Sequence, residues 1–137
     1  MLPSGSVDSQ WTQKGYAQGV PMGGQLPATQ DTNLAPTFMI KAQKDPNAAH
    51  LDRIQIIKGW LDDDGNSQEQ VYDVVASGAR TRNPVTGLFE PIKDTTDLTT
   101  ATYSNTEGSP NLEGVWRDPD FDAQQAAFYY VRVLEIP

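Results

Sequence analysis

The sequence predicts a mainly β domain, an immunoglobulin-like antiparallel β-sandwich with long irregular loops and little helix. Two β-rich runs flank Asp64-Gly65, a dipeptide that tolerates the positive φ angles of a tight hairpin turn. Residues 128–136 alternate apolar side chains between two faces, as a strand does. The 137 residues include 11 glycines and 10 prolines and are 37% hydrophobic, a balance that favours short strands and turns over a helical bundle.

The N-terminal quarter of the chain lacks a periodic apolar pattern. Residues 1–35 are predicted to be an irregular Gly- and Pro-rich segment, and residues 36–137 the β-sandwich domain. Within the first segment, 15–24 is expected to be extended with tight bends at its glycines, and 25–36 to be a surface loop. These glycines are not predicted to bind phosphate, because no strand precedes them and the Gly-Lys-Ser/Thr ending is missing.

The hairpin is predicted over residues 52–76. On its first strand Ile54, Ile56 and Trp60 share one face, and Lys58 is the lone polar residue on that face. Strict alternation sorts the second strand into Tyr72, Val74 and Ala76 on one face and Val71 and Val75 on the other. A strand that is apolar on both faces is typical of the inside of a sandwich.

The remaining elements are expected on both sides of the hairpin. The first strand is predicted over 36–44 and the last over 128–136, and residues 77–97 form a long loop that is functional, packed or mobile. The Thr-rich run 98–104 is β-prone, and 112–116 is either a short strand or one helical turn. Asp122 is a candidate cap for a turn of helix through Ala127.

Charge and composition exclude several function classes. A net charge of −8 disfavours nucleic acid as a partner, since phosphate binding needs clustered Lys and Arg. Membrane insertion is not expected, because no apolar run approaches the roughly 20 residues of a spanning helix. The absence of cysteine removes disulfides and thiolate chemistry. The N-terminus lacks the pattern of a signal peptide, and neither cytoplasm nor periplasm is favoured.

No catalytic, cofactor or metal site is predicted in this chain. His50 is the single histidine and is expected in a surface loop, whereas hydrolytic metal centres usually need several imidazoles. The run 62–66 resembles the start of a calcium loop, but Ser67 stands where glycine is needed, so a charged hairpin tip is favoured. Asp118, Asp120 and Asp122 are interpreted as a turn. Core packing is expected for Trp60 and Trp116, and exposure for Trp11.

Several motifs occur along the chain in a fixed order: Gly15–Gly24, Leu51–Trp60, Val71–Val74, Ala101–Asn105, Val115–Asp122 and Phe128–Pro137. Together they resemble the bacterial family catalogued as domain of unknown function 3604. Full-length members of that family resemble metal-dependent phosphoesterases of the polymerase-and-histidinol-phosphatase type. The resemblance places their metal ligands upstream of this chain, so the chain is expected to be the C-terminal portion. A chain that stops one residue after an apolar strand fits that expectation.

The sequence therefore leaves two functional hypotheses. The first is a noncatalytic accessory β-sandwich that flanks the missing N-terminal catalytic-like domain of a larger hydrolase-like protein. The alternative is a freestanding module that binds a ligand, possibly a carbohydrate. Candidate contact or ligand residues are Trp11, Tyr16, Met22, Arg80 and Arg82. Because the surface that meets the missing domain would be bare, a homodimer through the edge strand 128–136 is also expected.

Overall fold

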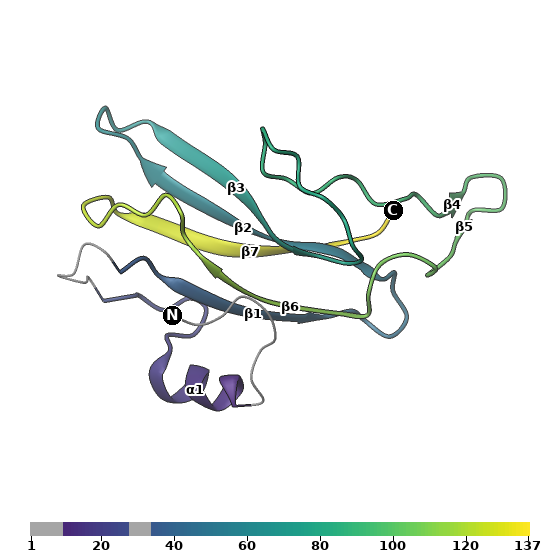
Figure 1. Cartoon of the computed structure of the whole chain (residues 1–137), viewed down its shortest axis with the longest axis horizontal. Helices are drawn as coiled ribbons and strands as arrows, with labels where there is room; N and C mark the ends of the chain where they lie inside the picture. Colours follow the sequence, from purple (N-terminus) through teal and green to yellow (C-terminus); the bar gives the residue numbers. More distant parts are fainter. Residues whose placement is uncertain (1–9, 28–33) are drawn as a thin grey trace.

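The computed structural model describes residues 10–27 and 34–137 and confirms a mainly β, antiparallel chain (Figure 1). Its elements are α1 (Trp11–Gln18), β1 (Thr37–Gln43), β2 (Leu51–Leu61), β3 (Ser67–Ala76), β4 (Thr96–Asp97), β5 (Thr102–Tyr103), β6 (Asn111–Arg117) and β7 (Ala127–Glu135). The strands form three antiparallel groups, with orders β1-β6, β3-β2-β7 and β4-β5. The immunoglobulin-like topology and the domain boundary at residue 36 stay predictions.

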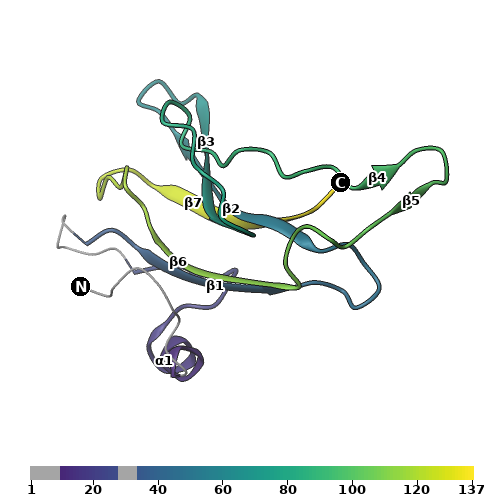
Figure 2. The ribbon, with the colours of Figure 1, turned by 45° about the vertical axis from the view of Figure 1, so that its right-hand side comes forward.

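Two of these sheets pack face to face as a sandwich. In Figures 1 and 2 the β1-β6 pair forms one layer and β3-β2-β7 the other, while the short β4-β5 pair extends beyond one end of the sandwich. The interior contains Ile54 and Ile56 of β2, both fully buried, packed against Ile40 of β1 and Leu112 of β6. Burial of such side chains is the main term that holds the two layers together.

The predicted hairpin forms around Gly65, which has a φ of 81°. The Asp62 carboxylate accepts hydrogen bonds from the backbone N–H groups of Asp64 and Asn66, at 3.1 and 2.8 Å. The Gly65 amide donates to the Asp62 carbonyl at 2.9 Å. The turn is thus closed by its own side chain, and the strands on either side match the predicted range.

A β-bulge corrects the predicted faces of β3. The register pairs Ile54 with Val75 but Gln55 with Asp73, so Val74 is an extra residue. Val74 and Val75 consequently both pack against the core, although alternation had placed them on opposite faces. The face prediction is therefore wrong at Val75, and also at Ala76, which pairs with Arg53 on the outer face.

The N-terminal segment differs from the expected extended chain because residues 11–18 form α1. This stretch contains one glycine and no proline, so nothing in it prevents a helix. The helix ends where Gly19 adopts an extended conformation two residues before Pro21. Part of the predicted loop 25–36 lies outside the described residues.

Two further predictions in the second half are wrong, and one alternative is settled. Residues 98–101 are a turn rather than strand, because the Asp97 carboxylate accepts from the backbone of Thr99 at 2.9 Å. Residues 123–125 form a turn and a bend rather than a helical turn; the Asp122 carboxylate accepts from the Gln124 amide at 2.8 Å. Residues 111–117 form a strand. In the part of the chain that is described, no helix is both long and apolar enough to span a bilayer.

Candidate functional site

The residues predicted as a contact or ligand surface lie in two separate places. Trp11 and Tyr16 belong to α1 and Met22 follows it, whereas Arg80 and Arg82 lie in the loop after β3. Both views show α1 beside the β1-β6 layer and this loop on the far side of the molecule (Figures 1 and 2). The structure therefore does not bring the two groups together. Tyr16 and Met22 are almost fully exposed, whereas Trp11 is half-buried, contrary to the expected exposure.

The two arginines hold the long loop in place. Arg80 donates to the carbonyls of Ser77, Asp52 and Glu90 at 3.1, 2.7 and 3.0 Å. Arg82 donates to the Asp73, Gly87 and Val74 carbonyls at 2.7, 2.9 and 3.2 Å. Its guanidinium also lies 4.0 Å from the centroid of the Phe89 ring. Of the three readings of residues 77–97, the packed loop describes this part.

The loop covers one end of the outer face of the three-stranded sheet, where Asp73 is the central acceptor. The Asp73 side chain is fully buried and accepts from Gln55 Nε2 at 2.6 Å, Arg53 Nη1 at 2.9 Å and the Phe89 amide at 2.6 Å. Arg132 of β7 donates in turn to Gln55 Oε1 at 2.9 and 2.6 Å. One hydrogen-bonded network therefore connects all three strands with the loop.

A second charged cluster lies between the layers and explains why the polar residue Lys58 stands on the apolar face of β2. Its Nζ lies 2.8 Å from Asp118 Oδ2, and the two side chains are 3% and 0% exposed. Lys58 also donates to the Asp120 carbonyl at 2.6 Å, and Tyr129 Oη donates to Asp118 at 2.6 Å. Buried charges persist when they are paired and hydrogen-bonded in this way. The cluster fastens the β6–β7 connection to the centre of the sheet.

These contacts shift the pKa values of the groups involved. Burial pushes the pKa of Asp118 upward, but hydrogen bonds from Lys58 and Tyr129 outweigh it and hold that pKa below its ordinary value. Burial raises the pKa of Tyr129, and its bond to Asp118 raises it further. Tyr72 donates to Asp120 Oδ2 at 2.7 Å, and burial and this bond raise its pKa likewise.

The residues weighed as ion ligands are engaged in local contacts. The Asp62 carboxylate binds the amides of its own turn and Gln68 Nε2, which lowers its pKa. His50 is half-buried, with Nδ1 2.9 Å from the Glu107 carbonyl. Among residues 10–27 and 34–137 no three His, Asp or Glu side chains are grouped so that they could hold a metal ion.

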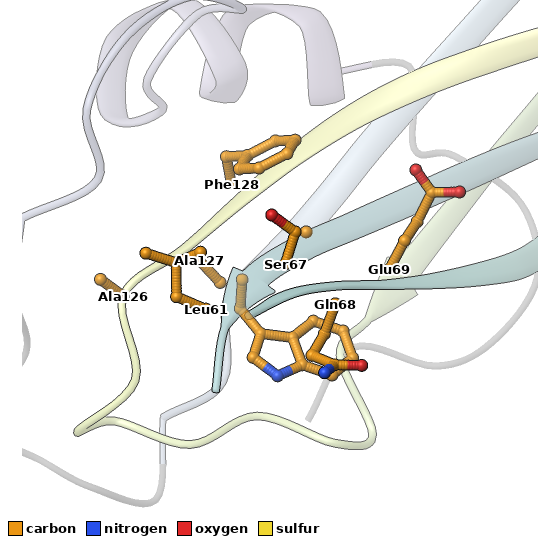
Figure 3. Close-up of a pocket in the computed structure, with 9 residues that line it drawn as sticks. Leu61, Ser67, Gln68, Glu69, Ala126, Ala127 and Phe128 are labelled. Carbon is orange, nitrogen blue, oxygen red and sulfur yellow. The ribbon is translucent and has the colours of Figure 1, made fainter. Parts of the chain in front are cut away.

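The other end of the three-stranded sheet carries an open groove of about 420 Å³. It is lined by Gly59, Trp60, Leu61, Ser67, Gln68, Glu69, Ala126, Ala127 and Phe128. In Figure 3 the side chains of Ser67, Glu69 and Phe128 lie on one side of the sheet and that of Gln68 on the other. The groove therefore wraps around the end of the sheet instead of entering the core.

Phe128 is the main apolar feature of this groove. Its ring lies over Gly59 on the neighbouring strand, in the space that a Cβ at that position would need. Its outer face remains open, since Phe128 is 61% exposed. The Tyr130 ring is nearly parallel to it, at 12° and 6.4 Å between centroids. Sequence reasoning missed this site, although Gly59 inside an apolar strand is a signal of close approach by another group.

Of three comparisons with known proteins, one gave a match. A protein-family model described as "Protein of unknown function (DUF3604)" matches residues 3–137. Neither the curated proteins nor the solved structures provide a match.

Proposed function

The chain belongs to the DUF3604 family of proteins of unknown function, and from this premise we propose that it is a noncatalytic accessory β-sandwich. It would be the C-terminal part of a larger, metal-dependent hydrolase-like protein whose substrate is unknown. The observation that carries the proposal is the open groove at the free end of the three-stranded sheet. Leu61 and Phe128 are each 61% exposed there, and clustered exposed apolar side chains mark surfaces that pack against another protein.

The charged groups favour a supporting role as well. Asp73, Lys58 and Asp118 are buried in contacts that connect strands to each other or to loops. Arg80 and Arg82 donate to main-chain carbonyls of their own domain. These charged groups are thus engaged within the domain, whereas Leu61 and Phe128 at the groove face solvent. That distribution suits a domain that stabilises or flanks a neighbour.

The test of this function is binding to the neighbouring domain. The coding region upstream of this chain would be expressed separately and titrated with the chain by calorimetry. We expect measurable binding, weakened at least tenfold by Leu61→Glu or Phe128→Glu, because a buried unpaired carboxylate in the contact is costly. Leu98→Glu is the matched control, since Leu98 is 92% exposed in a turn outside the groove.

Two outcomes would contradict the proposal. One is no binding to the upstream product, or equal weakening by Leu98→Glu. The other is hydrolysis of phosphoesters by the chain alone with added divalent metal, provided that His50→Ala abolishes it. Circular dichroism of each variant would separate a lost contact from a lost fold.

A second candidate function, carbohydrate binding, is favoured by one observation. Phe128 and Tyr130 place two exposed aromatic rings side by side on the outer face of the sheet, nearly parallel and 6.4 Å apart between centroids. Apolar faces of sugar rings pack well on such surfaces, and Glu69 and Ser67 could supply hydrogen bonds at the same groove. This surface differs from the α1 residues that the sequence indicated.

A glycan array followed by a tryptophan fluorescence titration would test the alternative. If Phe128 and Tyr130 form the binding surface, Phe128→Ala and Tyr130→Ala should abolish binding and Trp11→Ala should not. Loss of binding with Trp11→Ala alone would move the site to α1. Absence of any glycan signal would leave the accessory function as the better explanation.

A further inference from the structure

The two edges of the three-stranded sheet, formed by β3 and β7, are built differently. At the β3 edge, the Arg82 guanidinium binds the carbonyls of Asp73 and Val74, at 2.7 and 3.2 Å. These carbonyls lie at the bulge, which itself interrupts regular pairing. The other half of β3 exposes only polar side chains, at positions 67–70. Bulges and polar edge residues are devices that prevent edge-to-edge pairing.

The β7 edge combines exposed apolar side chains with two exposed charged residues, Arg132 and Glu135. Phe128, Tyr130 and Val133 are 61%, 45% and 42% exposed. β7 runs for nine residues and, among residues 10–27 and 34–137, pairs on one side only, with β2. A long apolar edge strand presents unpaired backbone groups to any strand of matching character. The strand is therefore a pairing surface.

We infer that β7 pairs antiparallel with β7 of a second copy of this chain, which joins two three-stranded sheets into one across a two-fold axis. A second copy is the occupant that fits because the strand is self-complementary. Full overlap of Ala127–Glu135 with itself places Val131 on the axis, since it is the middle residue. The two-fold relation also keeps outer faces on the same side of the joined sheet.

This register brings compatible side chains opposite each other. Arg132 faces Tyr130 of the second copy, so its aliphatic part can pack on that ring while its guanidinium stays bound to Gln55 of β2. Phe128 faces Leu134 on the same outer face, and Tyr129 faces Val133 on the inner one. Moving the axis by one residue toward the C-terminus would place the two Arg132 guanidinium groups opposite each other. Moving it the other way would leave Leu134 opposite residue 126, beyond the strand.

The other sheet is less suited to this pairing. β1 exposes Thr37, Lys41 and Gln43. β6 exposes the charged residue Glu113, although Val115 is exposed next to it. Lysine and glutamate on edge strands oppose association. The net charge of −8 on each chain also opposes association, so we expect added salt to tighten the dimer by screening that repulsion.

The first experiment is sedimentation equilibrium of the whole chain and two lysine variants. We expect a dimer for the unchanged chain, tightened between 50 and 500 mM NaCl, and a monomer for Val133→Lys. Val115→Lys on β6 is the matched control, because Val115 is 45% exposed and Val133 42%. A monomer for the unchanged chain at every concentration would overturn the inference. So would equal dissociation by Val115→Lys, with circular dichroism confirming that each variant is folded.

A second experiment tests the register. The chain has no cysteine, so Val131→Cys would introduce its single thiol. Directly opposed positions in an antiparallel pair bring Cβ atoms to about 4.5–5.5 Å, near the range in which a disulfide forms. Oxidation should link Val131→Cys chains covalently and leave Val133→Cys chains unlinked, because residue 133 faces residue 129. The reverse pattern would overturn the proposed axis. Leu61→Glu should leave the dimer intact, which separates this interface from the groove contact.

Discussion

The two strands that flank β2 share one partner and one sheet but are stabilised in different ways. β3 is held by polar contacts from elsewhere in the chain, above all Arg53, Gln55 and the Phe89 amide around Asp73. β7 contributes aromatic rings, and Phe128 and Tyr130 leave much of their surface to solvent. The difference shows that the loop after β3 protects the β3 edge of the sheet from pairing with another strand. Where the loop does not reach, the sheet remains open to a partner.

Among the changes that test this comparison, removal of the Asp73 carboxylate should lower the free energy of unfolding most. Asp73→Ala leaves Arg53, Gln55 and the Phe89 amide without their shared acceptor in a buried site. We expect a loss of about 3–5 kcal/mol in the free energy of unfolding, measured by urea titration. Asp63→Ala at the exposed hairpin tip is the control and should change stability by less than about 0.5 kcal/mol. A small effect at Asp73 would mean that the loop does not stabilise this side of the sheet.

A methyl group at Gly59 tests the β7 side. In Gly59→Ala the new Cβ would occupy the space of the Phe128 ring, so the ring must move. We expect a cost of about 1–3 kcal/mol from this overpacking. In the Phe128→Ala background the same change should cost less, and the double-mutant cycle measures the coupling between the two positions. Additive effects would show that the ring does not rest on the glycine.

Removal of the Arg82 guanidinium should make the two edges more alike. Arg82→Ala takes the donors away from the Asp73 and Val74 carbonyls, and we expect a loss of about 1–2 kcal/mol because Arg82 itself is exposed. With both edges open, pairing can continue beyond a dimer. Light scattering should then detect larger assemblies, whereas Arg82→Lys should retain part of the protection. If the assemblies of Arg82→Ala are no larger than those of the unchanged chain, the bulge alone prevents pairing at the β3 edge.

Two half-buried tyrosines, one on each outer strand, provide the test with the smallest expected effect. Tyr72 on β3 and Tyr129 on β7 both have a pKa raised above the ordinary value of 10.0. Their contribution is complete below the unfolded pKa, near pH 10, and is lost as pH rises above it toward the folded value. Each Phe substitution should cost about 1 kcal/mol at pH 7 and flatten the decline in unfolding midpoints between pH 10 and 11. We expect the larger effect for Tyr129, because its acceptor Asp118 is fully buried.

Strand positions were predictable because alternation and turn chemistry are local. The Asp64-Gly65 turn and the apolar pattern of β7 lie where the sequence predicted them. The faces of Val75 and Ala76 were not predictable, since the bulge depends on how β3 pairs with β2. Helix α1 was missed because Gly15 inside it and the glycines that follow it led to the prediction of an extended segment over residues 15–24. The bulge error thus arises from a longer-range contact, whereas the errors at 98–101 and 123–125 arise from local turns closed by aspartate side chains.

The site was less predictable than the fold for a similar reason. Lys58 stood out as a polar residue in an apolar face, but its partner Asp118 lies 60 positions away. Arg80 and Arg82 were predicted as contact or ligand residues. The structure shows instead that their guanidinium groups donate to main-chain carbonyls of the same domain. Gly59 gave the one local signal of the groove. Its meaning depended on Phe128, which β-sheet pairing brings to it from a distant segment.

The central position of β2 has a consequence for the order of folding. Its pairing with β3 closes a five-residue turn, and hairpins of this kind form in about 1–10 μs. Its pairing with β7 joins residues as far apart as Gln55 and Arg132, 77 positions along the chain. Such distant pairing is slow because chain entropy must be lost before the contacts form. We therefore expect that the β2-β3 hairpin forms early, before β2 pairs with β7. Pulse-labelled hydrogen exchange should detect this order as late protection of the β7 amides.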